Sequence, residues 1–465
     1  MIEFILNNKP IKTDQPTGSL LLDFVRYEQS LMGTKIGCRE GDCGACTVLI
    51  GELTDGKLNY RQVTSCLMPL GNVQGNHVVT IEGLNMESLS PVQQFMVDES
   101  GSQCGFCTTG FVVSLTQFCL ANSTPSYKDA IASIDGNICR CTGYKPIERA
   151  AKHITKSLTD KDQNKTLDWL IAQKFIPSYF NQIPEMLNAL PKGKNDSQNR
   201  TIVGGGTDLY VQQHDQLIDQ NVDLISNTPD LNFVEINNSV CKVGAGSTAT
   251  DLMESDIFCS AFPRLKKHIK LVASSPIRNM ATIGGNFVNA SPIGDFTAFF
   301  LALNAKIKLT NKGQNRTIYL KDFYKGYKDL DKSPDEIVST ISFKLPTQNS
   351  HYNFEKVSKR IHLDIASVNT AFHITISKNV VTQAHLSAGG VGPIPMYLGK
   401  TCAFLTDKVL SPETVQSANE IIQTEINPIS DVRGSADYKR LLFRQLFYAH
   451  FITLFPNQFT LDSFK

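Results

Sequence analysis

The spacing of apolar and polar residues divides the chain into a strand-rich start, a helical second region and two longer mixed regions. Apolar and polar residues alternate over 2–6 and 11–12, which predicts a β-hairpin, and residues 19–29 have the repeat of an amphipathic helix. Further strands are predicted at 47–50 and 78–81. These elements together indicate a small α+β unit.

From residue 90 the pattern becomes helical, and four helices are predicted, which indicates a bundle: 91–99, 109–122, 127–134 and a stretch after Pro146. The segment SLTDKDQNKTLD at 157–168 is polar, charged and aperiodic. That composition is typical of a solvated connector between domains. We therefore expect the first major boundary there.

The rest of the chain is again mixed. A region rich in glycine turns ends near 344–348, and beyond it the pattern predicts strands at 371–377 and 380–387 and a helix at 438–454. We divide the chain into five parts: a domain at 1–84, a helical domain at 85–156, a linker at 157–175, a domain at 176–348 and a C-terminal domain at 349–465.

Charge and hydropathy exclude several classes of protein. The 465 residues include 45 Lys and Arg against 44 Asp and Glu, so no broad positive field is available for a nucleic acid backbone. No apolar stretch approaches the roughly 20 residues of a membrane span. The N-terminus lacks the basic start and cleavage site of a signal peptide. We expect a cytoplasmic protein that binds neither nucleic acid nor membrane.

The twelve cysteines carry the first chemical information. In a reducing cytosol, clustered cysteines are candidates for metal ligands rather than for disulfides. Eight lie in the first third of the chain and are predicted to be ligands. The other four are isolated and are expected to serve as small buried apolar residues: Cys119, Cys241, Cys259 and Cys402.

The first cysteine group has the spacing of a plant-type ferredoxin. The segment CREGDCGAC places Cys38, Cys43 and Cys46 in a C-x4-C-x2-C pattern, which Cys66 completes. Neighbouring glycines allow the chain to wrap closely round a cluster, so that amides can donate to its sulfurs and raise its potential. A zinc site is the alternative, but it usually has two short CxxC pairs. We predict a [2Fe–2S] cluster on these four cysteines.

A second group combines a CxxC with a CxC, on either side of a helical hairpin: Cys104, Cys107, Cys139 and Cys141. A CxC within a helix would point its sulfurs about 200° apart, so this pair must lie at a helix start or a turn. By spacing alone zinc is a serious alternative. The neighbouring ferredoxin pattern favours a second [2Fe–2S] cluster. Two such sites in one chain indicate an electron relay.

Three motifs, CREGDCGACTV, QCGFCTTG and DGNICRCTGY, resemble those of the molybdenum hydroxylase family, which includes xanthine dehydrogenases and aldehyde oxidoreductases. The resemblance implies a β-grasp ferredoxin domain and then a four-helix domain, whose cluster lies nearest the molybdenum cofactor. It also implies that Gln103 hydrogen-bonds molybdopterin across a domain interface. The family usually has proline at the position of Thr109, where a threonine can instead cap the helix.

Two glycine-rich segments indicate a dinucleotide site. IVGGGTDL at 202–209 runs from an apolar strand into a turn whose amides could cradle a pyrophosphate, although ordinary tight turns also use glycine. TIGGN at 282–286 adds a second glycine turn. The pair resembles the FAD domain shared by xanthine dehydrogenases, carbon monoxide dehydrogenase medium subunits and vanillyl-alcohol-oxidase-type flavoproteins of the PCMH/VAO fold.

By that resemblance, Asp295 accepts a hydrogen bond from the isoalloxazine edge, and Lys356 lies near the flavin, where a cation favours the reduced ring. An ordinary surface lysine is the alternative for Lys356. The segment 359–367 resembles the one that controls access of NAD to the flavin. The remaining FAD contacts implied by the resemblance are Ile202, Val203, Gly204, Gly205, Gly206, Thr207, Asp208, Leu209, Thr282, Gly285 and Asn286.

The segments at 387–395 and 431–438 resemble the C-terminal domain of carbon monoxide dehydrogenase flavoproteins. The expected fold is therefore a multidomain α+β chain with a β-grasp [2Fe–2S] domain, a four-helix [2Fe–2S] domain, an FAD-binding α+β domain and this C-terminal α+β domain.

Fusion of clusters and FAD in one chain resembles the small subunit of bacterial xanthine dehydrogenases. It implies two [2Fe–2S] clusters, FAD, and NAD as acceptor. A large molybdenum-cofactor subunit would oxidise xanthine or hypoxanthine, in a heterodimer or a dimer of heterodimers, and no residue of this chain is expected to act on the substrate. One alternative is the same role with an aldehyde or another N-heterocycle. The other is a non-enzymatic, zinc-stabilised scaffold.

Overall fold

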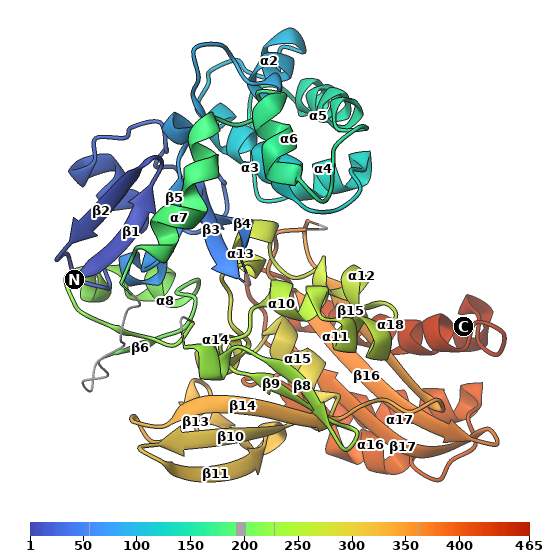
Figure 1. Cartoon of the computed structure of the whole chain (residues 1–465). Helices are drawn as coiled ribbons and strands as arrows, with labels where there is room; N and C mark the ends of the chain where they lie inside the picture. The colour runs from blue at the N-terminus through green and yellow to red at the C-terminus, as the bar shows by residue number, and fades with distance from the viewer. Residues whose placement is uncertain (55, 192–200, 227, 361) are drawn as a thin grey trace. The chain divides into compact units, whose positions relative to one another are not determined.

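The computed structural model describes residues 1–54, 56–191, 201–226, 228–360 and 362–465. They form two compact units (Figure 1). The first unit comprises Met1–Ile225 together with Ser274–Ala281, and the second comprises Ser226–Ala273 and Thr282–Lys465. Within the described ranges, no helix is both long and apolar enough to cross a membrane.

The first unit begins with a five-stranded sheet of order β2-β1-β5-β3-β4. Its strands are β1 (Ile2–Leu6), β2 (Lys9–Thr13), β3 (Thr47–Thr54), β4 (Lys57–Thr64) and β5 (His77–Val79). β1 pairs antiparallel with β2 and parallel with β5, so the sheet is mixed. The predicted helix at 19–29 forms as α1 (Leu21–Asp23) followed by a π-helical turn, Phe24–Glu28, whose apolar residues join the core beneath the sheet.

The four predicted helices follow: α2 (Pro91–Asp98), α3 (Thr108–Leu120), α4 (Tyr127–Ser133) and α5 (Lys145–Ser157). Ser90 begins α2 with a capping box, because its hydroxyl accepts from the Gln93 amide while the Gln93 side chain accepts from the Ser90 amide. α3 is buried along nearly its whole length. A helix that is apolar on all sides belongs in a core, and here the other helices pack round it.

The segment 157–175 is not the solvated linker that its composition predicts. Thr166–Ala172 forms α6, and Leu158, Leu170 and Phe175 are buried in the core of the helical region. Lys161 is also buried and donates to two carbonyls at the end of α3, where a helix leaves backbone acceptors unsatisfied. The polar composition predicts the wrong environment for this segment, because some of its apolar residues, Leu158, Leu170 and Phe175, pack into the core.

The first unit also contains part of the region expected to form the third domain. Its elements are α7 (Ile183–Asn188), β6 (Ile202–Val203), α8 (Leu209–Gln212), α9 (His214–Leu217), β7 (Asp223–Leu224) and α13 (Ser275–Arg278). β6 and β7 pair in parallel, and Val203, Leu224 and Met280 belong to the same apolar core as the first sheet.

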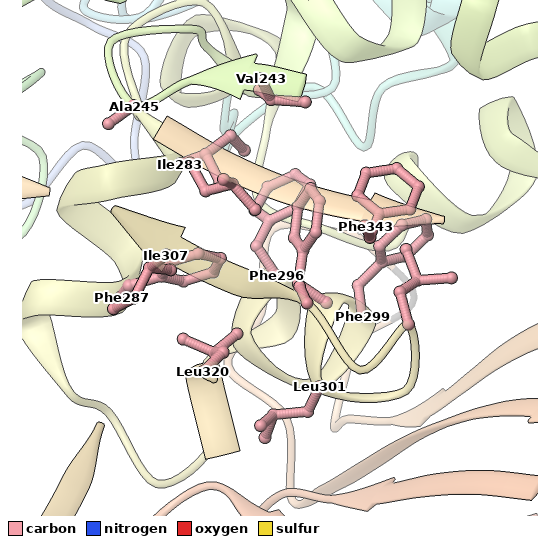
Figure 2. Packing of buried hydrophobic residues seen from close by; sticks show 14 of the residues in the cluster. Val243, Ala245, Ile283, Phe287, Phe296, Phe299, Leu301, Ile307, Leu320 and Phe343 are labelled. Atoms are coloured by element: carbon pink, nitrogen blue, oxygen red, sulfur yellow. The ribbon is translucent and has the colours of Figure 1, made fainter. Parts of the chain in front are cut away.

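The second unit contains a five-stranded antiparallel sheet of order β11-β10-β14-β9-β8. Its strands are β8 (Val234–Asn237), β9 (Val240–Gly244), β10 (Lys306–Asn311), β11 (Gln314–Tyr319) and β14 (Ile337–Lys344). Five helices precede β10: α10 (Ala249–Glu254), α11 (Asp256–Ala261), α12 (Leu265–Ile269), α14 (Ile283–Asn289) and α15 (Asp295–Leu301). Phe287 from α14 and Phe296 and Phe299 from α15 pack with Ile307 and Phe343 of the sheet (Figure 2).

A four-stranded antiparallel sheet completes the second unit in the order β15-β16-β17-β18. Its strands are β15 (Ser350–Val357), β16 (Val368–Ser377), β17 (Val380–Ala388) and β18 (Met396–Tyr397), and its helices are α16 (Gly399–Leu405), α17 (Pro412–Glu425) and α18 (Ala436–Leu454). The two predicted strands and the predicted C-terminal helix correspond to β16, β17 and α18. Together, the mixed sheets and helices confirm the multidomain α+β class.

Candidate iron–sulfur and flavin sites

The loop before β3 and the turn after β4 bring the first four predicted ligands together as two pairs. Cys38 is hydrogen-bonded to Cys43, and Cys46 to Cys66. Cys46 and Cys66 are buried, whereas Cys38 and Cys43 are half-buried. Two pairs are what a [2Fe–2S] cluster requires, because each of its two irons takes two cysteine ligands. The thiols present therefore fit such a cluster.

The backbone of this loop supplies donors to sulfur. The amides of Glu40 and Asp42 each lie 3.3 Å from Cys38 Sγ and donate to it. A Cβ at Gly37 would lie 2.5 Å from Cys43 Sγ, so the chain passes the thiols more closely than a side chain would allow. Amide donors of this kind stabilise a negatively charged cluster.

Hydrogen bonding within each pair separates the two thiol pKa values. The bond from Cys43 lowers the pKa of Cys38 to about 5 and raises that of Cys43. The bond between Cys46 and Cys66 lowers the pKa of Cys46 and raises that of Cys66. In each pair the pKa of one thiol is thus shifted toward the thiolate, which is the form that binds metal.

The second cysteine group is also arranged as two pairs. Cys104 and Cys141 have their Sγ atoms 3.5 Å apart, and Cys107 is hydrogen-bonded to Cys139. Thr142 donates to Cys139 Sγ from its amide at 3.4 Å, and its hydroxyl lies 3.1 Å from the same sulfur. These four thiols fit a second cluster by the same argument. Among the described residues, no group of three or more His, Cys, Asp or Glu side chains has the arrangement needed to hold a single metal ion.

The CxC pair lies in a turn just before α5, as its spacing predicts. Gly143 and Tyr144 both have left-handed backbone, with φ of 67° and 70°, and the Tyr144 hydroxyl accepts from the Cys139 amide at 3.1 Å. This turn directs the sulfurs of Cys139 and Cys141 toward their partners on the other side of the helical hairpin.

The structure corrects the expected role of Thr109. Helix α3 begins at Thr108, with Cys107 at its N-cap and no side-chain cap bond. Thr109 therefore lies within the first turn, and its buried hydroxyl has no partner among the described residues. Gln103 is exposed beside Cys104, and its contact with molybdopterin stays a prediction.

The isolated cysteines are mostly buried, as expected. Cys119, Cys241 and Cys402 are buried, and burial raises the thiol pKa of Cys119 and Cys241 to about 12. Cys259 is only half-buried and donates to the Met253 carbonyl.

The short segment Ser274–Ala281 contacts both cysteine loops, which the sequence patterns did not indicate. Arg278, whose side chain is 3% exposed, pairs with Asp135 at 2.6 Å, and the Ser275 amide donates to the same carboxylate at 2.7 Å. An added Cβ would meet Pro276 at 2.8 Å from Gly136, and Ile277 at 2.6 Å from Gly41. This segment therefore braces the loops that carry both sets of ligands.

The predicted FAD residues fall into both units. In the first, 202–209 forms the expected strand, turn and start of a helix, with Gly206 at a φ of 81°. A Cβ on Gly205 would lie 1.7 Å from the Met280 carbonyl oxygen. Packing alone therefore requires glycine at 205, so this glycine by itself does not argue for a bound pyrophosphate.

In the second unit, Thr282 caps α14 by accepting from the Gly285 amide at 3.1 Å. Asn286 accepts from the Thr297 amide at 3.1 Å, which ties α14 to α15. The structure thus places these three residues on one short helix. Their contacts with FAD stay predictions.

Asp295 and Lys356 form a buried ion pair. The Lys356 side chain is 1% exposed, and its Nζ lies 2.6 Å from Asp295 Oδ2 and 2.8 Å from the Leu271 carbonyl oxygen. Asn369 donates to the other oxygen of Asp295 at 2.6 Å. Lys356 is therefore not an ordinary surface lysine. Asn369 belongs to this network although no sequence motif indicated it. In the neighbouring 359–367 segment, residue 361 lies outside the described residues.

Four family models match the chain in succession. A 2Fe-2S iron–sulfur cluster binding domain matches residues 4–71 and a [2Fe-2S] binding domain matches 80–152. The FAD binding domain in molybdopterin dehydrogenase matches 174–347, and the CO dehydrogenase flavoprotein C-terminal domain matches 353–454.

The four matches give the chain two iron–sulfur domains, an FAD-binding domain of the molybdopterin dehydrogenase type and a CO dehydrogenase flavoprotein C-terminal domain, a set similar to that of the molybdenum hydroxylase family. The expected fold class and its four domain types are confirmed.

Curated relatives of this chain include several xanthine dehydrogenases. The xanthine dehydrogenase of Emericella nidulans is 28% identical over 96% of this chain, and xanthine dehydrogenase 1 of Arabidopsis thaliana is 27% identical over 94%. The xanthine dehydrogenase/oxidase of Rattus norvegicus is 26% identical over 98%. The chain spans only 38% of the first two relatives and 39% of the third.

Solved structures share the fold over about half of the chain. Carbon monoxide dehydrogenase from Hydrogenophaga pseudoflava matches with a TM-score of 0.51 and 24% identity, over 54% of this chain and 88% of that one. Quinoline 2-oxidoreductase from Pseudomonas putida 86 matches with a TM-score of 0.50 and 22% identity, over 55% of this chain and 89% of that one.

Proposed function

We propose that this chain is the electron-transfer subunit of a xanthine dehydrogenase. In this proposal a partner subunit hydroxylates xanthine or hypoxanthine at a molybdenum cofactor, and the chain conducts the electrons to NAD. The observation that carries the proposal is the presence of two paired four-cysteine sites and an FAD-binding domain in one chain. Xanthine dehydrogenases match 93–98% of that chain.

The cysteine loops would each hold one [2Fe–2S] cluster, and the FAD-binding domain at 174–347 would hold FAD. When bound, the clusters supply one-electron storage and FAD the two-electron chemistry needed to form NADH. The chain itself contributes position and charge. The amides of Glu40 and Asp42 stabilise the first set of thiolates, and Thr142 does the same in the second.

The second cysteine site has the surroundings expected for docking of a molybdenum subunit. Cys104 and Cys141 are exposed. Three apolar side chains within three residues of a ligand are exposed as well, namely Phe106 at 47%, Ile138 at 39% and Tyr144 at 38%. Exposed apolar residues around a functional edge are typical of an interaction surface. This supports a partner that covers the second site, with Gln103 at the same edge.

The buried Asp295 and Lys356 pair supports a flavin role for both residues. The charges of the Lys356 ammonium and the Asp295 carboxylate cancel, and Asn369 orients the carboxylate by a hydrogen bond. An ion pair whose charges cancel keeps its geometry without adding net charge. The carboxylate could therefore accept a hydrogen bond from the flavin ring, while its negative charge weakens the attraction of the lysine for the reduced ring. NAD as acceptor rests on likeness to the xanthine dehydrogenases alone.

A first experiment measures iron, zinc and flavin in the anaerobically purified chain, together with its visible spectrum. The proposal predicts about four irons per chain, since two [2Fe–2S] clusters hold that number, about one FAD, and bands that bleach with dithionite. Zinc-loaded, colourless protein would contradict it and favour the scaffold.

A second experiment purifies the chain with its co-expressed partner and compares xanthine, an aldehyde and quinoline as substrates, with NAD as acceptor. Preferential oxidation of xanthine with formation of NADH is expected. If another substrate were preferred, the proposed electron-transfer role would stand, but the assignment to xanthine dehydrogenase would be wrong.

A further inference from the structure

The two cysteine loops are joined directly by backbone and side-chain hydrogen bonds inside the first unit. The Ile138 amide donates to the Cys43 carbonyl at 3.0 Å. Asn137 Nδ2 donates to the Gly44 carbonyl at 3.1 Å. Cys43 is a predicted ligand of the first cluster, and Ile138 directly precedes Cys139, a predicted ligand of the second. The loops therefore meet within one residue of a ligand on each side.

Three glycines, Gly44, Gly110 and Gly136, allow the backbones of the two cysteine loops and of α3 to approach closely at this junction. A Cβ on Gly110 would lie 2.2 Å from the Gly44 carbonyl oxygen, and a Cβ on Gly44 would lie 2.3 Å from the Gly136 carbonyl oxygen. Any larger residue would push the loops apart, so the separation of the loops is set by backbone contact at this point.

Asn137 is suited to this junction because its amide both donates and accepts. Its Oδ1 accepts from the buried Ser114 hydroxyl at 2.8 Å, which orients Nδ2 toward the Gly44 carbonyl. That carbonyl also accepts from the Thr47 amide and hydroxyl. Loss of Asn137 would therefore leave the first loop with its own hydrogen bonds while removing a tether to the second.

We propose that Asn137 is a positioning residue that holds the two cluster-binding loops at a fixed separation. The inference rests on the proposed function, in that both loops must carry [2Fe–2S] clusters. Asn137 contacts neither set of sulfurs in the described hydrogen bonds; it acts through Gly44 and through the backbone that leads to Cys139.

The test is electron paramagnetic resonance of the full-length chain, reduced with dithionite so that both clusters are paramagnetic. Their magnetic interaction depends steeply on separation and orientation, and a purely structural role elsewhere in the fold would not change it. For Asn137→Ala we expect iron near that of wild type, together with a loss or broadening of the resolved splitting. Thr116→Val is the matched control, because its buried hydroxyl bonds within α3 to Val112 and does not reach the junction.

Ser114→Ala removes only the bond that orients Asn137, and we expect a smaller change of splitting in the same direction. If Asn137→Ala fails to retain iron, this variant decides the question. Spectra of both variants identical to wild type at full iron content would overturn the inference, and so would a wild-type spectrum without any interaction. Wild-type protein that lacks iron would instead contradict the proposed function.

Discussion

The two cysteine sites share one ligand chemistry and differ in their surroundings. In the first, Cys46 and Cys66 belong to the apolar core of the sheet, together with Leu21 and Val48. In the second, Cys104 and Cys141 are exposed, and only Cys139 is fully buried. One site is thus embedded in the fold, while the other lies at its surface.

The difference indicates that the two sites depend on the fold in different ways. The first loop is closed by its own amides and by the core, so its cysteines stabilise the domain as well as offering ligands. The second loop is held by the turn at Gly143 and Tyr144 and by the brace from Arg278 to Asp135. Because buried contacts stabilise this loop, its exposed side can bind another protein without a change in the loop's own structure. Variants that act on one site at a time test this contrast.

Replacement of one ligand at each site should give the largest effect. Cys66→Ser is expected to abolish the first cluster and to lower the melting temperature markedly. It removes the stabilisation that a bound metal group gives the folded state, and it leaves a buried hydroxyl that costs about 1–3 kcal/mol. Cys104→Ser should abolish the second cluster with a smaller fall in melting temperature, because that residue is exposed and its new hydroxyl stays in contact with water.

The measurements are iron per chain and thermal unfolding followed by circular dichroism. Both variants should lose about half of their iron, and the first should lose more stability than the second. Equal destabilisation by the two variants would break the contrast between an embedded and a surface site.

Removal of the brace should come next in size. Arg278→Met leaves Asp135 without its closest cation in a largely buried position, and breaking such a pair typically costs about 3–5 kcal/mol. The double variant Arg278→Met with Asp135→Asn is the control, because it removes the stranded charge and should recover part of the loss. Urea unfolding of each variant gives the comparison. A single variant as stable as wild type would show that the second loop does not depend on this brace.

The features that could be predicted from the sequence are those that depend on the spacing of nearby residues. The ferredoxin spacing, the CxC turn before α5 and most helices and strands could be predicted because each depends on residues close together in the chain. The solvated linker was predicted wrongly because α6 is stabilised by packing of Leu170 and Phe175 against distant helices. The polar residues that precede α6 in the sequence do not indicate this packing.

Contacts between distant residues could not be predicted from one sequence. Arg278 and Asp135 are 143 positions apart, and neither belongs to a ligand motif. The Asn369 bond to Asp295 likewise joins strand β16 to helix α15. Residue type alone does not distinguish such partners from other polar residues, because burial decides their role. The Lys356 prediction depended on resemblance, and only the fold reveals its ion pair.

Two glycines with the same backbone dihedral allow a matched comparison of the sites. Gly44 and Gly143 both have a φ of 67°, so alanine at either position costs about 1–2 kcal/mol for the left-handed conformation. At Gly143 an added Cβ meets nothing within 4 Å, whereas at Gly44 it would lie 2.3 Å from a carbonyl oxygen. Gly44→Ala should therefore lose about 1–3 kcal/mol more than Gly143→Ala. Denaturant midpoints measure the difference, and equal losses would argue against a closed first loop.

The smallest expected effect is a gain of stability at the second site. Thr109 lies in the first turn of α3, and its buried hydroxyl has no partner among the described residues. Proline suits the first helical turn and restricts the unfolded chain. Thr109→Pro should raise the unfolding free energy by about 0.4–1 kcal/mol, with iron content unchanged. Thr108→Pro is the control, because the Thr108 amide donates to the Gly105 carbonyl and proline would remove that bond. If Thr109→Pro proved destabilising, the start of α3 would depend on the Thr109 amide or hydroxyl, and the surface site would be less tolerant than its exposure suggests.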